Sequence, residues 1–161
     1  MAVSRGVFFD TSILVAGMVD LGESSRSPLA LLDAVADQAV EEPMTAWHCC
    51  LEFFSVTTRL PEEYRLSADH ALRLLREEVL PRFAVHGLAP ERREPFLVSA
   101  AAEGAYGGRI YDAHIAEIAH QAAARIVVSD NHRHFASLRR HGVQVLTSGE
   151  LAARPEVWGR D

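Results

Sequence analysis

Short apolar segments alternate with longer helical segments along this chain. Because strands that alternate with covering helices assemble into parallel sheets, this order predicts an α/β fold. The expected architecture is a three-layer α/β/α sandwich around a central, mainly parallel sheet. Ligands of such sheets bind at the carboxyl ends of the strands. The five predicted strands cover residues 6–10, 44–46, 83–87, 125–129 and 143–146.

The segments between these strands carry helix signals. Ser27 stands before Pro28, which predicts a capping hydroxyl, a proline at the first helical position and a helix over 29–40. Ser67 is expected to cap a helix in which apolar residues recur at helical spacing as far as Val79. Further helices are predicted over 47–59, 91–105 and 109–124, the last two separated by Gly104 and the Gly107–Gly108 pair.

The length of 161 residues fits one domain, which we expect to occupy residues 1–150, with a short C-terminal tail over 151–161. The longest apolar run, Ile13–Val19, is far shorter than the roughly 20 residues that cross a bilayer. No basic segment leading into an apolar one opens the sequence, so we expect a cytoplasmic protein with no membrane partner.

Lysine is absent, and arginine alone supplies the 16 Lys and Arg residues. This excludes P-loop and Schiff-base chemistry, both of which need a lysine. The net charge of −6 argues against a broad basic surface for nucleic acid. Cys49 and Cys50 are adjacent and lie among apolar residues, so we expect them to pack in the core rather than to form a disulfide.

Two acidic residues stand out near predicted strand ends and helix starts. Asp10 follows the first strand, where it either caps the next helix or faces a ligand. Thr11 and Ser12 come next and could cap that helix or hydrogen-bond to an oxygen of Asp10. Glu52 lies among bulky apolar residues. Because burying an unpaired carboxylate costs several kcal/mol, Glu52 must either reach solvent or meet a cation.

Two further acids occupy similar positions later in the chain. Asp112 falls in the first turn of a predicted helix, where the helix dipole favours a negative charge, and shares a face with Ala116 and Ala119. Asp130 follows the strand over 125–129. Together with Asn131, it either forms a turn or helix cap or offers oxygen ligands.

Taken together, the four acids predict a site for divalent metal ions. Oxygen ligands without a cysteine–histidine pattern favour Mg²⁺ or Mn²⁺ over Zn²⁺. Clustered carboxylates repel one another and stay ionised when a metal is bound. Two divalent ions would neutralise four carboxylates, so that a phosphodiester could enter the site of an acidic protein. The chemistry indicated is metal-assisted phosphodiester hydrolysis.

Four segments carry a resemblance to a known family. The segments are Phe8–Ser12, the surroundings of Glu52, Gly108–Ala116 and Val127–Phe135. In them the chain resembles the PIN-domain ribonucleases that form the toxin of VapBC toxin–antitoxin pairs, and the resemblance spans nearly the whole chain, residues 6–147.

The resemblance implies roles for the acids. Asp10, Glu52 and Asp112 would form the acidic core that holds the catalytic metal, Asp10 and Asp112 by direct contact. Glu52, with Asp130 or Asn131 as the fourth site residue, would orient the attacking water or take a second ion. The family also implies an endoribonuclease that uses Mg²⁺ or Mn²⁺ to cleave RNA, a small antitoxin that blocks the site, and a toxin homodimer.

Basic residues near these segments have two interpretations. A histidine could move a proton during hydrolysis, and a guanidinium group pairs well with phosphate, although both are also common as surface residues. The candidates are His114, His120, His132 and His134, and Arg109, Arg133, Arg139 and Arg140.

Two other functions compete with the nuclease. One is a catalytically silent PIN-like module that binds RNA or a protein, which the presence of all four acids disfavours. The other is a phosphotransfer domain with Asp10 as the phosphoacceptor. The absence of lysine, and Ser12 in the place where a phosphatase would carry a second aspartate, argue against it.

Overall fold

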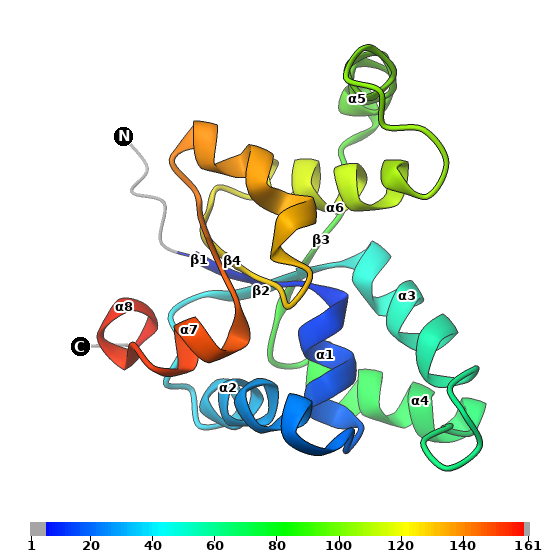
Figure 1. The fold of residues 1–161 in the computed structure, drawn as a ribbon, viewed down its shortest axis with the longest axis vertical. Coiled ribbons are helices and arrows are strands. Elements are labelled where there is room, and N and C mark those ends of the chain that lie inside the picture. The colour runs from blue at the N-terminus through cyan, green and yellow to red at the C-terminus, as the bar shows by residue number, and fades with distance from the viewer. Residues whose placement is uncertain (1–5, 160–161) are drawn as a thin grey trace.

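The computed structural model describes residues 6–159 and contains one five-stranded sheet (Figure 1). The order of strands across the sheet is β3-β2-β1-β4-β5, and every pair is parallel. The predicted three-layer α/β fold is therefore confirmed, and each predicted strand end lies within one residue of the observed end. The strands are β1 (Gly6–Phe9), β2 (Pro43–Ala46), β3 (Ala84–His86), β4 (Ala124–Val128) and β5 (Gln144–Leu146).

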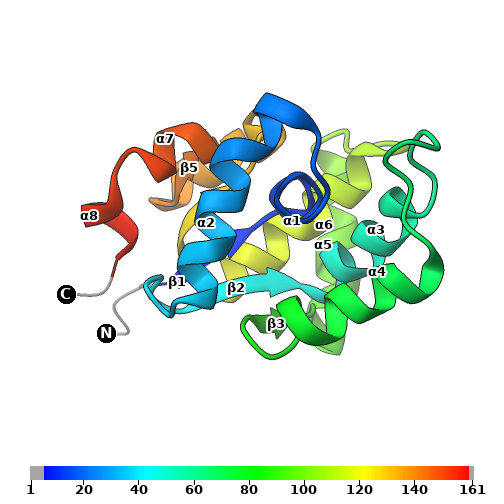
Figure 2. The ribbon, with the colours of Figure 1, turned by 90° about the horizontal axis from the view of Figure 1, so that it is seen from below.

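Helices cover both faces of the sheet (Figure 1). On one face lie α5 (Pro90–Ala102), α6 (Arg109–Gln121) and the 3-10 helical segment η3 (His132–His141). The other face carries most of the remaining helices, and Figure 2, seen from below, shows α1 and α2 in front of the strands with α3 and α4 to one side. These elements are α1 (Thr11–Met18), η1 (Gly22–Ser25), α2 (Arg26–Ala36), α3 (Trp47–Thr57), α4 (Ala68–Leu74), η2 (Leu75–Val79), α7 (Ser148–Ala152) and α8 (Pro155–Trp158).

The core lies on both sides of the central strand. Val7, Phe8 and Phe9 of β1 are completely buried, as expected for a parallel strand with helices on both faces. Ile13 of α1 and Ile115 of α6 cover the strand from the two sides and are equally buried. Cys49 and Cys50 are also buried and carry free thiols, which confirms that they pack in the core.

The start and end of α2 differ from the prediction. The helix begins at Arg26, so Ser25 rather than Ser27 occupies the N-cap position, and Pro28 falls within the first turn. A proline is tolerated there because the first four N–H groups of a helix have no partner within the helix. The helix ends at Ala36 instead of residue 40, since Gln38 adopts a left-handed conformation with φ of 58°.

Other helix signals are confirmed. The Ser67 hydroxyl accepts a hydrogen bond from the backbone N–H of His70 at 3.1 Å, so Ser67 caps α4 as predicted. The helix then continues through η2, a single π-helical turn. After α5, Gly104 and Gly107 take positive φ values of 75° and 57°, which glycine adopts readily, and these turns separate α5 from α6.

The described part of the segment after residue 150 packs against the domain. Leu151 is completely buried, and its carbonyl accepts a hydrogen bond from the Trp158 indole at 2.7 Å. The Trp158 carbonyl in turn accepts from the backbone N–H of Glu41 at 3.1 Å. These contacts hold α7 and α8 beside the chain that enters β2.

Candidate active site

Asp10 stands where the connectivity of the sheet reverses. From β1 the chain builds β2 and β3 on one side of the sheet and β4 and β5 on the other. Such a switch point leaves a crevice at the carboxyl ends of the strands, where ligands of open α/β sheets bind. Asp10 is the residue after β1, and its backbone N–H donates to the carbonyl of Val128, the last residue of β4, at 3.1 Å.

Two serine hydroxyls hold the Asp10 carboxylate. Ser129 Oγ donates to Asp10 Oδ2 at 2.7 Å, and Ser12 Oγ donates to the same oxygen at 3.0 Å. Asp10 occupies the N-cap position of α1, but its side chain accepts no capping hydrogen bond, so helix capping does not explain it. Ser12 was expected from its spacing to Asp10, whereas nothing local to Ser129 indicated this contact.

Burial works against the charge on Asp10. Only 4% of the residue is exposed, and this burial raises the pKa of its carboxyl group above the ordinary value. The Ser129 and Ser12 hydroxyls offset part of the rise, while the negative charge of Glu52 adds to it. In the described part of the chain Asp10 has no ion pair, so its carboxyl group is buried without a cation beside it.

Glu52 enters the site from α3. It is partly buried, and its carboxylate lies 3.7 Å from Nε2 of His48, one turn earlier on the same helix. This histidine is the main cause of the lowered pKa of Glu52, and the Thr11 hydroxyl and the Arg59 charge lower it further. Glu52 was expected either to reach solvent or to meet a cation, and the structure leaves its side chain partly exposed to solvent.

Asp112 enters from the first turn of α6. Its Oδ2 lies 2.9 Å from His134 Nδ1 of η3. Partial burial raises the pKa of Asp112, the nearby Glu52 charge raises it further, and His134 opposes both effects. Ala116 and Ala119, on the same face of α6, are buried as predicted.

Asp130 and Asn131 are placed differently. Both carboxylate oxygens of Asp130 accept hydrogen bonds from the Ser148 hydroxyl, at 2.8 and 2.9 Å, and one also accepts from the Ser148 backbone N–H at 2.9 Å. Asp130 thus fixes the first turn of α7. Asn131 is exposed, and its backbone N–H donates to Ser129 Oγ at 3.0 Å. The structure therefore brings Glu52 within electrostatic reach of both Asp10 and Asp112, while the Asp130 side chain is engaged by α7.

A histidine pair beside the acids was not predicted as a unit. Nδ1 of His48 and Nδ1 of His114 share a hydrogen bond at 2.8 Å, which links α3 to α6. His114 appeared among the candidate histidines, but His48 did not. Its position four residues before Glu52 on one helix is the signal that could have found it.

The three acids suit a divalent cation in their chemistry. All are oxygen donors, and a cation would offset the burial of Asp10 and its repulsion by Glu52, both of which disfavour the ionised carboxylate. Between residues 6 and 159, however, no group of three His, Cys, Asp or Glu side chains is already arranged as a metal site. Mg²⁺ usually keeps several waters and is held by only one or two carboxylates, so binding does not need such a group of three.

Fold and site together define a class, the parallel α/β proteins that gather carboxylates where the strand order reverses. Within that class the family follows directly from comparison with known proteins. The PIN domain model matches residues 6–133, so the chain belongs to the PIN domain family. Ribonuclease VapC27 of Mycobacterium tuberculosis is 34% identical over 122 residues, which cover 75% of this chain and 82% of that protein.

Three solved structures share the fold. A chain of FitAB bound to an IR36 DNA fragment gives a TM-score of 0.59 at 14% identity and covers 88% of this chain and 94% of that one. FitAcB from Neisseria gonorrhoeae gives a TM-score of 0.59 at 15% identity and covers 89% of this chain and 98% of that one. VapBC-1 from nontypeable Haemophilus influenzae gives a TM-score of 0.57 at 16% identity and also covers 89% of this chain and 98% of that one. At these identities the likeness concerns the fold alone.

One further finding concerns membranes. In residues 6–159 no helix combines the length and the apolar character needed to cross a bilayer.

Proposed function

We propose that this chain is a VapC-like ribonuclease that hydrolyses RNA phosphodiester bonds with Mg²⁺ or Mn²⁺, and that it is the toxin of a toxin–antitoxin pair. The observation that carries the proposal is the buried, unpaired carboxylate of Asp10 at the switch point of the sheet, with Glu52 and Asp112 acting on the same site. The similarity to Ribonuclease VapC27 supports RNA as the substrate.

Asp10 and Asp112 would hold the metal, with Glu52 and either Asp130 or Asn131 completing the site. The bound cation would lower the pKa of the attacking water and stabilise charge on the phosphate. Ser12 and Ser129 fix the orientation of the Asp10 carboxylate through their hydrogen bonds, and His134 fixes that of Asp112. Glu52, which His48 helps to keep ionised, accepts a hydrogen bond from the attacking water and orients it.

Two partners follow from the same proposal. A small antitoxin would block the site, and a second copy of the chain would form a homodimer. The family resemblance implies both, and the fold likeness to VapBC-1 supports the antitoxin. Light scattering of the purified chain, alone and with the product of a neighbouring small reading frame, tests the two partners separately.

The decisive experiment measures cleavage of a mixed RNA pool by the purified chain with Mg²⁺, with Mn²⁺ and with EDTA. The Asp10→Asn variant is compared with Asp33→Asn, an exposed aspartate on α2. We expect metal-dependent cleavage that EDTA stops and that Asp10→Asn lowers by roughly a hundredfold or more, since a metal ligand supplies several kcal/mol of transition-state stabilisation. Equal activity of Asp10→Asn and Asp33→Asn would refute the proposed site.

A second candidate is the catalytically silent PIN-like module. The observation that favours it is that, over the described range, no three potential ligands are already arranged to hold an ion. Calorimetric titration with Mn²⁺ separates the two candidates. Binding that Asp10→Asn weakens supports the nuclease, and a folded chain that takes up no Mn²⁺ supports the silent module.

A further inference from the structure

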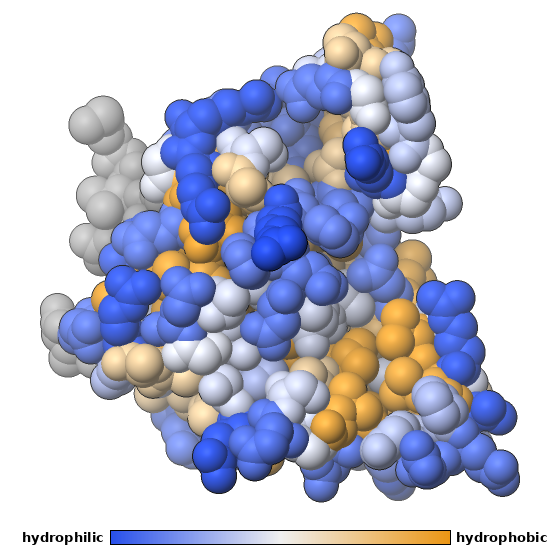
Figure 3. Space-filling view, viewed as in Figure 1, coloured by the Kyte–Doolittle hydropathy of each residue, from blue (hydrophilic) through white to orange (hydrophobic). Residues whose placement is uncertain are grey.

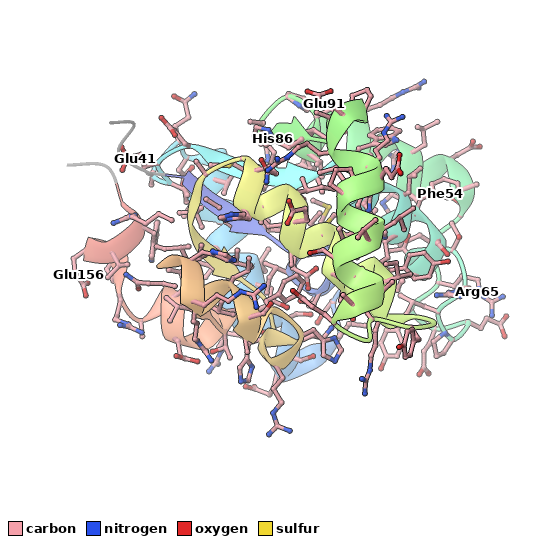
Figure 4. All side chains as sticks on the ribbon, turned by 90° about the horizontal axis from the view of Figure 1, so that it is seen from above. Glu41, Phe54, Arg65, His86, Glu91 and Glu156 are labelled. Carbon is pink, nitrogen blue, oxygen red and sulfur yellow. The ribbon has the colours of Figure 1, made fainter. Side chains whose placement is uncertain are left out.

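A second hollow opens beside the acidic site, between α5, α6 and η3. Figure 4 shows α5 and η3 on opposite sides of α6, and the space that they border has a volume of about 600 Å³. We call it the α6 cleft. Asp112 and His134 lie at its border, so the cleft leads directly to the candidate active site. Its basic lining residues are Arg109, Arg133, Arg140, His120, His134 and His141.

The acidic side chains of the α6 cleft already have partners. Glu103 accepts from Arg140 at 3.2 Å, Glu117 accepts from the amide of Gln121 at 2.8 Å, and Asp112 contacts His134. These contacts leave two arginines of the lining available.

Those two arginines are Arg109 and Arg133. Both are exposed, and neither makes an ion pair or a side-chain hydrogen bond with any residue between 6 and 159. Two free guanidinium groups on the wall of a cleft offer forked donors that match phosphate oxygens.

Arg109 and Arg133 lie near Asp112 on two different elements of the fold. Arg109 is the first residue of α6 and precedes Asp112 by three residues, so both lie on one side of the first turn. Arg133 precedes His134, whose Nδ1 lies 2.9 Å from Asp112 Oδ2. The two free cations therefore approach the acidic site from α6 and from η3.

The far end of the α6 cleft is also suited to a nucleic acid strand. The rings of His120 and His141 stack with their centroids 4.2 Å apart. His120 follows Arg109 by eleven residues on α6, which corresponds to roughly 16 Å along the helix axis. At 3.4 Å per nucleotide this length accommodates roughly five stacked nucleotides of a single strand.

The other hollow near the acids is less suited to phosphate. The groove between α3, α5 and α6 is lined mainly by apolar side chains, among them Trp47, Leu51 and Tyr111. Arg59 and Arg93 also line this groove. The charge of Arg59 already acts on Glu52, whereas Arg93 is an exposed residue of α5. Figure 3 shows hydrophilic surface over α6 and η3, and apolar surface lower on the same face, over α1 and α3.

We propose that the α6 cleft binds the phosphates of single-stranded RNA on one side of the scissile bond, with Arg109 and Arg133 as the phosphate-contacting residues. This inference rests on the proposed ribonuclease function. In this role the two arginines position the strand and take no part in bond cleavage.

Binding is measured by fluorescence anisotropy, with a fluorescein-labelled single-stranded RNA of mixed sequence and the full chain carrying Asp10→Asn to prevent cleavage. Arg109→Gln and Arg133→Gln are added singly and together. Each is expected to weaken binding about tenfold and to reduce the slope of log K against log salt by about 0.7. The matched control is Arg73→Gln with Arg76→Gln, two exposed arginines of α4 and η2 outside the cleft.

Cleavage by chains with the native Asp10 separates this inference from the proposed function. We expect Arg109→Gln and Arg133→Gln to raise KM about tenfold and to leave kcat nearly unchanged. The reason is that each arginine would contact the RNA equally in the bound complex and in the transition state. If the unsubstituted chain cleaves RNA while the cleft variants match the control in Kd and KM, the inference is wrong and the nuclease stands. If the unsubstituted chain cleaves nothing, the nuclease fails, and the anisotropy measurements still decide whether the cleft binds RNA.

Discussion

Ser129 Oγ donates a hydrogen bond of 2.7 Å to Asp10 Oδ2, although 119 residues separate the two side chains. The bond joins the residue after β1 to the residue after β4, at the point where the strand order reverses. Ser129 is itself completely buried. Of the groups that favour ionised Asp10, it has the largest effect on the pKa.

Ser129→Ala tests the importance of this bond. Loss of the donor raises the pKa of Asp10 further, so a reaction that needs ionised Asp10 requires a higher pH. We expect the acidic limb of the pH–rate profile for RNA cleavage to move to higher pH, and the free energy of unfolding to fall by about 1 kcal/mol. Ser24→Ala, which removes an exposed hydroxyl of η1, is the control, and a profile that coincides with it would contradict the prediction.

Asp10→Asn is expected to stabilise the fold while it abolishes cleavage. Because burial raises the pKa of Asp10, the folded state disfavours the carboxylate, and stability is lost as pH rises through that pKa. The variant should gain about 1 kcal/mol in free energy of unfolding at pH 7. The gain should vanish near the ordinary aspartate pKa of 3.8. Urea titrations at pH 7 and pH 4 measure it, and a variant less stable than the native chain at pH 7 would exclude this account.

Metal binding should stabilise the folded chain. If Mn²⁺ binds the acidic site, a concentration of 100 times Kd adds about 2.7 kcal/mol to the free energy of unfolding. The melting temperature should therefore rise with Mn²⁺ and fall again with EDTA, and Asp112→Asn should reduce the effect.

The same melting assay identifies the fourth site residue. Because the Ser148 hydroxyl and backbone N–H hold the Asp130 carboxylate at the start of α7, we expect Asn131→Ala to weaken the response to Mn²⁺ more than Asp130→Asn does. Asp130→Asn should instead lower the melting temperature without metal, since it disturbs the start of α7. A larger loss of the Mn²⁺ response in Asp130→Asn would assign the fourth position to Asp130.

The two cysteines should be chemically inert in the folded chain. Burial raises the pKa of Cys49 to about 12 and that of Cys50 to about 11, so both remain thiols at pH 8. Reaction with a chromogenic disulfide reagent should proceed only as fast as the chain unfolds, and both thiols should react at once in urea. Rapid reaction of one thiol in native buffer would show that its burial is incomplete.

Trp158 should stabilise the domain although it lies near the C-terminal end. Its indole donates to the Leu151 carbonyl, and its own carbonyl accepts from Glu41. Trp158→Ala should lower the free energy of unfolding by about 2 kcal/mol, from lost apolar contact and the lost hydrogen bond. Glu156→Ala, at an exposed position of α8, should leave it nearly unchanged, and equal effects of the two would argue against this packing.

Much of the fold could be predicted from local patterns. A strand or a capped helix is determined by residues within a few positions of one another, which is why the five strands and the Ser67 cap were confirmed. The start of α2 was predicted too late in the chain, because Ser25 and Ser27 are both suitable capping residues and proline is tolerated anywhere in the first turn.

The site could be predicted only in part. The types and positions of Asp10, Glu52 and Asp112 follow from where strands end and helices begin, and the sequence alone placed all three at one edge of the sheet. The engagement of Asp130 by Ser148 depends on how β5 returns beside β4, which no local pattern specifies.

The sequence by itself determined the alternation of strands and helices, the parallel class of the sheet and the acidic residues at its edge. The tertiary structure alone decided which side chains meet there. Phe9 pairs with Val128 in the register of β1 and β4, and this pairing places Ser129 beside Asp10. The physical reason is that register between distant strands is set by packing of the whole core, whereas strand and helix patterns are set by near neighbours.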